Sequence, residues 1–130
     1  MLPHSLTIKE AAEGLRNKDF SSRELVSACL KQIEKKNPDL NAFLTVTKAE
    51  ALAHSEAIDK KIKTGEKLSP LAGIPFGVKD SICARGIRST AATKILDNYI
   101  PPYDATVIAR LKERGGIVIG KQNCDGFGHG

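Results

Sequence analysis

The segment LAGIPFGVKD, residues 71–80, is the part of the sequence that most restricts the fold. It is a short apolar run with a lysine at its polar end. Because side chains alternate between the two faces of a strand, Ile74, Phe76 and Val78 are expected on one face and Lys79 on the other. The segment therefore predicts a short strand that ends at Lys79 and leads into a loop, where a reactive group could be presented.

The residues before this strand have helical patterns. Apolar side chains recur at helix spacing over residues 8–15 and again over residues 25–33. Ser21 and Glu24 have the spacing of a capping box and predict the start of the second helix. Asn37-Pro38 predicts its end, because the residue before a proline avoids the helical conformation.

A third helix is expected after an extended segment over residues 41–46. Thr47 and Glu50 have the spacing of a second capping box. The apolar face of this helix is thin and consists of Ala49, Leu52 and Ala53. The helix should end before Gly65.

The residues after position 70 alternate between strand and helix. A loop rich in Gly, Ser and Thr over residues 83–93 follows the Lys79 strand, then a helix over 104–114 and a strand over 117–120. This order predicts an α/β fold in which the first strands of a mixed, largely parallel sheet pack against the N-terminal helices.

A phosphate-binding loop is a tempting alternative for residues 115–121, which match GxxxxGK. However, Gln122 stands where a magnesium-binding Ser or Thr is required. The interior, GIVI, is also typical of a buried strand that follows a helix, rather than of a flexible turn. We therefore expect no nucleotide site here.

Lys79 is the candidate catalytic residue. A lysine acts as a base only as the neutral amine, whereas an ordinary lysine, with a pKa of about 10.4, is protonated at neutral pH. Dry surroundings without a carboxylate partner favour the neutral form. Strand alternation points Asp80 away from Lys79, so we expect Asp80 to face the other side and Lys79 to lie in dry surroundings. On position alone, a lysine at a strand end more commonly holds its ammonium in water.

Composition and charge are compatible with a catalytic role and do not specify it. The 130 residues are 41% hydrophobic and 27% charged, which is ordinary for a globular protein. The net charge of +5 permits contact with nucleic acid. The lysine pairs at 35/36 and 60/61 have acidic neighbours on helical patterns, however, which favours solvated helix faces.

The cysteines and the hydropathy pattern restrict the location. Cys29, Cys83 and Cys124 are widely spaced and form no CxxC motif, which argues against a disulfide framework and a zinc site. No run of 18 apolar residues is present. We expect a protein of the cytoplasm, or of an organelle matrix, that does not enter a membrane and binds no metal or cofactor in this chain.

Two long runs of this sequence resemble a known family. PLAGIPFGVKD and KILDNYIPPYDATVIARLKERGGIVIGKQN resemble the N-terminal third of the amidase signature family. SLTIKEAAEGLRNKDFSSRELV and NPDLNAFLTV resemble its opening helices, and NYIPPYDATVI is typical of those members that act in aspartyl/glutamyl-tRNA amidotransferases. The resemblance implies that residues 1–130 are the N-terminal part of one amidase domain of α/β/α architecture, helical over 1–70 and alternating over 71–130.

The resemblance also implies a chemistry. In this family the lysine of GVKD is the base of a Ser-Ser-Lys triad. The resemblance assigns this role to Lys79. The two serines are expected in a later Gly- and Ser-rich segment that these 130 residues do not contain, so the chain alone is expected to be inactive. The implied reaction is glutamine hydrolysis that supplies ammonia for the amidation of misacylated Glu-tRNA or Asp-tRNA. The amidotransferase B and C subunits are the implied partners, and one of them would use ATP and magnesium and bind most of the tRNA.

The last residues depart from the family pattern. The family usually has an acidic residue where Gly126 stands and Ala-Met where Gly128 and His129 stand. We interpret Gly128, His129 and Gly130 as a substrate loop, in which the glycines could increase mobility. A lone histidine has no sequence neighbours that would make it a base or a metal ligand.

Two other functions stay open at this level. One is an amidase of the same family that hydrolyses a small or acyl amide without tRNA. The other is a non-catalytic module that binds a partner. The DNYIPPYDATVI match favours the amidotransferase interpretation.

Overall fold

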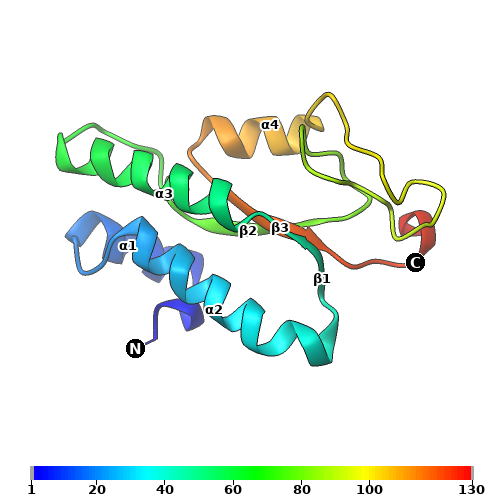
Figure 1. The fold of residues 1–130 in the computed structure, drawn as a ribbon. Helices are drawn as coiled ribbons and strands as arrows, with labels where there is room; N and C mark the ends of the chain where they lie inside the picture. Colours follow the sequence, from blue (N-terminus) through cyan, green and yellow to red (C-terminus); the bar gives the residue numbers. More distant parts are fainter. Residues whose placement is uncertain (1, 130) are drawn as a thin grey trace.

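The computed structural model describes residues 2–129 and has a mixed three-stranded sheet at its centre. The strand order is β1-β3-β2, in which β1 (Phe43–Val46) pairs antiparallel with β3 (Ile117–Gln122) and β2 (Pro75–Lys79) pairs parallel with β3. Helices α1 (Ile8–Asn17) and α2 (Ser22–Leu40) lie on one side of the sheet and α4 (Thr106–Glu113) lies on the other (Figure 1). The predicted α/β class with N-terminal helices on a mixed sheet is confirmed.

The first two helices begin with capping boxes. A 3-10 turn, η1 (Pro3–Ser5), precedes α1 (Ile8–Asn17), whose N-cap Thr7 exchanges hydrogen bonds with Glu10. Ser21 and Glu24 make the same exchange at the start of α2 (Ser22–Leu40), as predicted. Each box satisfies backbone N–H groups that have no partner within the helix.

The predicted end of α2 at Asn37-Pro38 is wrong. The helix continues through Pro38 to Leu40 and ends where Asn41 takes a left-handed conformation, with φ of 49°. The Asn41 N–H donates to the Asn37 carbonyl at 2.8 Å, which closes the last turn. Pro38 has no N–H to donate, so the helix lacks one intrahelical hydrogen bond at this position and is closed beyond it by the bond from Asn41.

The third helix, α3 (Lys48–Lys63), has the predicted extent but a different cap and a different buried face. The Thr47 side chain does not cap it, because its hydroxyl donates to the Val118 carbonyl of β3 at 3.0 Å. Ala51, Ser55 and Ile58 are buried, whereas the expected Ala49 and Ala53 are exposed. Tertiary contact with β3 therefore decided which face of this helix turned inward.

The sheet is covered by apolar clusters on both faces. On one face, side chains of α2 and α3 pack against β3, namely Val26, Leu30, Ala51, Ile117 and Ile119. On the other face, α4 (Thr106–Glu113) covers the strands through a cluster of Val78, Ala84, Ile108 and Val118. Phe76 packs on this second cluster, as alternation predicted.

Ile74 is an exception to the predicted alternation. It precedes β2 and packs with Leu15 and Leu25 of the first two helices rather than with Val78. A backbone hydrogen bond from its N–H to the Leu71 carbonyl shows that residues 71–74 form a turn. Period-2 alternation does not apply within a turn.

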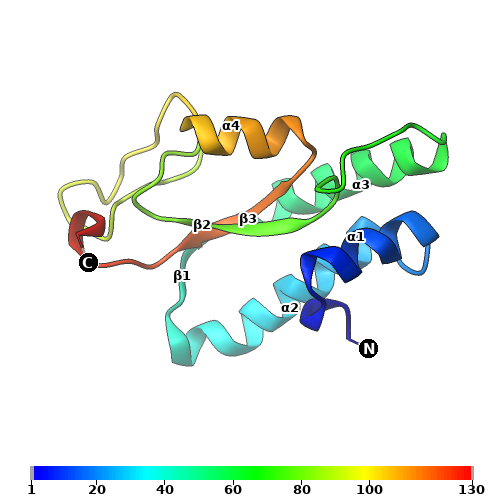
Figure 2. The same ribbon diagram turned by 180° about the vertical axis from the view of Figure 1, so that it is seen from behind.

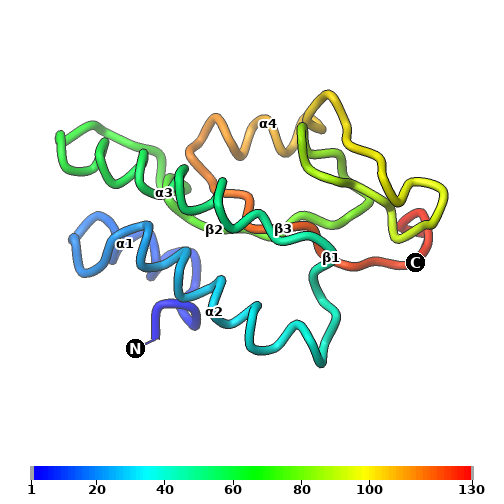
Figure 3. Tube along the Cα trace, viewed as in Figure 1, coloured from blue at the N-terminus to red at the C-terminus, as the bar shows by residue number. Residues whose placement is uncertain are grey.

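The long segment between β2 and α4 and the C-terminal turn η2 (Gly126–Gly128) lie at one end of the molecule (Figures 2 and 3). The two are joined by a hydrogen bond from the Phe127 N–H to the Ala91 carbonyl at 2.8 Å. Within residues 2–129 no helix combines the length and the apolar character that crossing a membrane requires.

Candidate functional site

Lys79 is the last residue of β2 and is exposed. Its position at the end of a short strand, followed by a loop, is as predicted. The dry surroundings expected for it are not found in the described residues. Its neighbour across the sheet is Gln122, which is itself exposed, so the face of the sheet that carries these two side chains is open to solvent at this end.

Asp80 faces the opposite way from Lys79, as alternation predicted. Its side chain is fully buried, and its carboxylate lies 3.2 Å from the Lys121 Nζ. The Thr90 backbone N–H donates to the second carboxylate oxygen at 3.0 Å, and the Thr90 hydroxyl donates to the same oxygen. The carboxylate that follows Lys79 in the chain is thus occupied by other partners.

An irregularity in the sheet brings Lys121 to Asp80. The pairing of β2 with β3 shifts by one residue after Phe76, so that Val78 lies across from Lys121. Residues paired across neighbouring strands point to the same face, and Asp80 lies on the face of Val78. Without the shift, Lys121 would lie across from Lys79 and point to the face of Lys79.

Burial and hydrogen bonding act on Lys121 in opposite directions. Burial lowers its pKa, and the hydrogen bond to Asp80 opposes this effect. Its Nζ also donates to the Ser89 hydroxyl at 2.7 Å, and that hydroxyl donates to the Ile87 carbonyl at 3.0 Å. The amine is therefore held by two acceptors inside the protein.

The loop that supplies Ser89 and Thr90 contains two residues in an uncommon conformation. Ala91 and Ala92 have φ angles of 50° and 52°, a left-handed region that alanine seldom adopts. The Ala91 N–H donates to the Asp80 carbonyl at 3.0 Å, and the Ala92 N–H donates to the Thr90 hydroxyl at 3.1 Å. The contacts of Asp80 and Thr90 therefore stabilise a strained turn next to Lys79.

Of the predicted substrate loop, Gly128 lies beside Lys79. A Cβ placed on Gly128 would lie 3.6 Å from the Lys79 Cε and 2.9 Å from the Ser81 Oγ. Gly128 has φ of 67°, so the turn uses the conformational freedom of glycine at this position. His129 is exposed, and Gly130 lies outside the described residues.

Potential metal-ligating side chains and cysteines also occur elsewhere in residues 2–129. Among residues 2–129 no three His, Cys, Asp or Glu side chains lie together in an arrangement that could hold a metal ion. Cys29 packs between two apolar clusters, and burial raises the pKa of its thiol. The Cys83 thiol lies 3.4 Å from the Tyr103 hydroxyl, to which it donates.

The sequence reasoning missed Lys121, Ser89 and Thr90. The motif GxxxxGK includes Lys121, and the structure confirms that this run follows a helix and enters a strand. The expected strand ended at Gly120, whereas β3 continues to Gln122 and buries Lys121. A lysine that directly follows a buried strand was the available signal.

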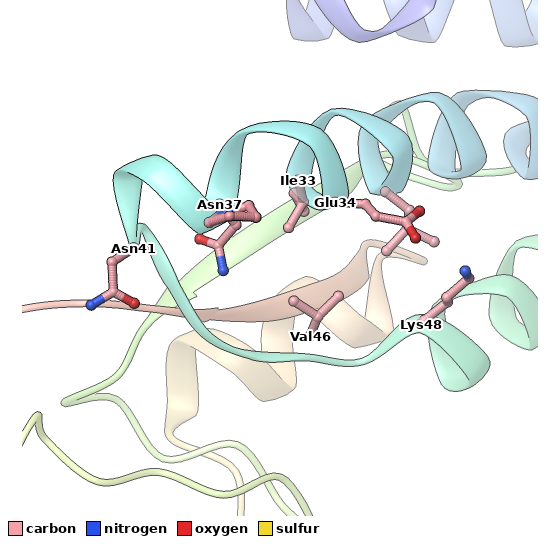
Figure 4. Close-up of a pocket in the computed structure, with 8 residues that line it drawn as sticks. Ile33, Glu34, Asn37, Asn41, Val46 and Lys48 are labelled. Carbon is pink, nitrogen blue, oxygen red and sulfur yellow. The ribbon is translucent and has the colours of Figure 1, made fainter.

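A groove of about 520 Å³ lies away from Lys79, between α2 and the segment that joins β1 to α3. Figure 4 shows Ile33 and Glu34 of α2 on one side of the groove, with Val46 and Lys48 on the other. It contains no residue of the Lys79 site.

Curated relatives match almost the whole chain. The chain is 46% identical over 127 residues to the A subunit of the glutamyl-tRNA(Gln) amidotransferase of Natranaerobius thermophilus, and the match covers 98% of this chain and 26% of that protein. It is 49% identical over 125 residues to the corresponding protein of Geobacter metallireducens, covering 96% and 26%. The chain thus spans about a quarter of the length of these relatives.

Solved structures and a family model agree with this similarity. A peptide amidase from Stenotrophomonas maltophilia superposes with a TM-score of 0.90 at 27% identity, over 98% of this chain and 26% of its own. A bacterial aryl acylamidase of the amidase signature family superposes with a TM-score of 0.88 at 26% identity, over 95% and 26%. The amidase family model matches residues 24–130, and the chain therefore belongs to the amidase family.

Proposed function

We propose that the whole protein carrying these residues is an amidase that hydrolyses glutamine and supplies ammonia for tRNA-dependent transamidation, with Lys79 as the base of a Ser-Ser-Lys triad. The similarity to glutamyl-tRNA(Gln) amidotransferase A subunits, at 46% and 49% identity, supports this choice among amidases.

One observation carries the assignment of Lys79. The lysine is at the end of β2 with its side chain exposed, while the adjacent Asp80 carboxylate is buried on the opposite face and bound to Lys121. A carboxylate paired with Lys79 would favour the ammonium form and oppose base chemistry. The arrangement leaves the amine of Lys79 available to a hydroxyl group.

The proposal implies a sequence of proton transfers. The neutral amine of Lys79 takes a proton from a bridging serine hydroxyl, which takes one from the nucleophilic serine. That serine attacks the amide carbonyl and forms an acyl-enzyme, and the proton leaves with ammonia. Water then hydrolyses the ester and regenerates the serine. The resemblance assigns both serines to a later segment, so the 130 residues alone are proposed to be inactive.

The partners follow from the same proposal. Ammonia would pass to a B subunit, which would use ATP and magnesium to amidate misacylated Glu-tRNA or Asp-tRNA, with a C subunit in the complex. Most tRNA contacts would be made by the partner. The exposed lysine pairs at positions 35/36 and 60/61 fit solvated helix faces.

The experiment is glutamine hydrolysis by the whole protein, assayed with and without the partner subunits. Lys79→Ala should abolish ammonia release and leave the circular dichroism spectrum unchanged. Lys36→Ala, an exposed lysine on α2, is the matched control and should retain activity. Retained hydrolysis in Lys79→Ala would remove Lys79 from the mechanism.

A second candidate function is the hydrolysis of an amide unrelated to tRNA. The structural similarity to a peptide amidase and to an aryl acylamidase favours this alternative. Competition between glutamine, a peptide amide and an aryl acylamide in the same assay separates the two. Preference for the latter substrates, unaffected by the partner proteins, would support the alternative.

A further inference from the structure

The buried pair of Asp80 and Lys121 has no part in the proton transfers proposed above. Both side chains have 0% exposure, and the Nζ to Oδ1 distance is 3.2 Å. The cost of removing two charges from water offsets much of their attraction, so such a pair is weak evidence for stability. An apolar pair of similar volume would fill the same space. The charges therefore call for an explanation beyond packing.

We infer that Lys121 is a positioning residue for Lys79, because it holds the Asp80 carboxylate on the opposite face of the sheet and balances its charge. This inference rests on the proposed role of Lys79 as a base. Without Lys121, the Asp80 carboxylate would be an unbalanced charge one residue from the amine. A nearby negative charge favours the ammonium form and reduces the fraction of neutral amine.

The register of the sheet makes Lys121 suitable for this role. The one-residue shift between β2 and β3 moves Lys121 to the face of Asp80. In a regular pairing, the two lysines would lie across from each other on one face, and the Asp80 carboxylate would have no cation from β3. Strand alternation thus keeps Lys79 and Asp80 on opposite faces, and the irregularity supplies the Asp80 carboxylate with a cation.

The same carboxylate is linked to the turn around the site. Thr90 donates to it, and Ala91 donates its N–H to the Asp80 carbonyl and accepts from the Phe127 N–H. Phe127 precedes Gly128, which lies against the Lys79 stem. Removing Lys121 would therefore act on Lys79 through charge and through the position of this turn.

Other titratable groups surround this arrangement. The Cys83 and Cys124 thiols lie close enough to Lys121 to interact with its charge. In the C-terminal turn, Asp125 and His129 lie on either side of residues 126–128, of which Gly128 lies against Lys79. The residue of β3 that faces Lys79 is the uncharged Gln122. Variants at Lys121, Asp80 and Lys112 keep all of these groups, so their contributions are common to every comparison.

The test is the pH dependence of kcat/KM for amide hydrolysis by the whole protein. The acid limb of this profile is the range in which kcat/KM rises as Lys79 loses its proton. Lys121→Met should move it to higher pH by about one unit. Adding Asp80→Asn to it removes the unbalanced carboxylate and should return the limb to its original position. Asp80→Asn alone should not move the limb upward. A purely structural role would lower the rate in all three variants without this reversal.

Two further variants control for folding and for general charge effects. Lys121→Gln keeps an N–H donor on a shorter side chain, and it provides the same charge change if Lys121→Met does not fold. Lys112→Met is the matched control, because it breaks the partly exposed ion pair between Lys112 of α4 and Asp104. The control should leave the acid limb unchanged, and an equal shift there would overturn the inference.

A second measurement does not depend on turnover. Acetic anhydride acetylates only the neutral amine, so the rate of Lys79 acetylation measures the fraction of Lys79 that is neutral. The rate is measured by mass spectrometry at a series of pH values. Its profile should move to higher pH in Lys121→Met and Lys121→Gln. If neither the acid limb nor the acetylation profile moves in either variant, while Lys79→Ala still loses hydrolysis, this inference is overturned and the proposed function stands. Retained hydrolysis in Lys79→Ala would overturn the proposed function.

Discussion

Gly128 lies so close to Ser81 that a Cβ at position 128 would approach the Ser81 Cβ and Oγ to 2.9 Å. This contact connects the C-terminal turn to the residue that follows Asp80. It also brings the turn to the Lys79 stem, where the same Cβ would lie 3.6 Å from Cε. The geometry of this turn and the environment of Lys79 are therefore coupled.

Gly128→Ala should destabilise the protein by about 1–2 kcal/mol, because alanine is unfavourable at a positive φ and would press on Ser81. Urea unfolding measures the change. Gly126→Ala is the matched control, since a Cβ there meets nothing within 4 Å and should have a small effect. Equal stability of the two variants would contradict the contact with Ser81.

Gly120→Ala should cost about 1–3 kcal/mol, because a Cβ at this position would lie 2.5 Å from the Thr45 backbone carbonyl oxygen. The backbone of β1 cannot move away without breaking its pairing with β3. Gly77→Ala is the comparison, because there the atoms nearest to the Cβ belong to the end of the exposed Gln122 side chain, which can rotate. Thermal unfolding of the two variants should rank Gly120→Ala as the less stable. The reverse order would show that the β1 pairing is not rigid.

Thr47→Val should destabilise the protein by about 1 kcal/mol, because it removes the buried hydrogen bond to the Val118 carbonyl. Valine keeps the branched shape, so the loss reports the hydroxyl group. Thr64→Val removes an exposed hydrogen bond to the Lys61 carbonyl and should have little effect. If the two variants unfold at the same urea concentration, the Thr47 hydroxyl does not link α3 to β3.

The capping box of α2 should contribute a pH dependence to stability. Hydrogen bonds from the Ser21 backbone N–H and hydroxyl lower the pKa of Glu24 in the folded protein. The folded state therefore favours the carboxylate, and this stabilisation is present above the ordinary carboxyl pKa and is lost as the pH falls through the lowered value. The free energy of unfolding, measured between pH 7 and about pH 3, should depend less on pH in Glu24→Gln than in the unchanged protein.

Ser21→Ala tests whether this pH dependence comes from the capping box. It removes the hydroxyl that bonds Glu24, so its effect and that of Glu24→Gln should be less than additive in the double variant. Full additivity would mean that the two side chains act independently.

The two capped helices and the Lys79 strand could be predicted because their signals are local. The Ser21–Glu24 spacing fixes the start of α2, and the alternation over residues 76–80 put Lys79 and Asp80 on opposite faces. The α/β class followed from the order of these elements. None of these conclusions depends on which segments meet in space.

The buried face of α3, the environment of Lys79 and the role of Lys121 were decided only by the tertiary structure. Thr47 gave its hydroxyl to β3 instead of capping its helix, and a one-residue shift in the strand pairing moved Lys121 onto the face of Asp80. Such a shift leaves no mark in the local sequence, because it depends on how two strands some 40 residues apart fit against the helices that cover them. The chain order thus specified the elements, and long-range packing chose the partners of their polar side chains.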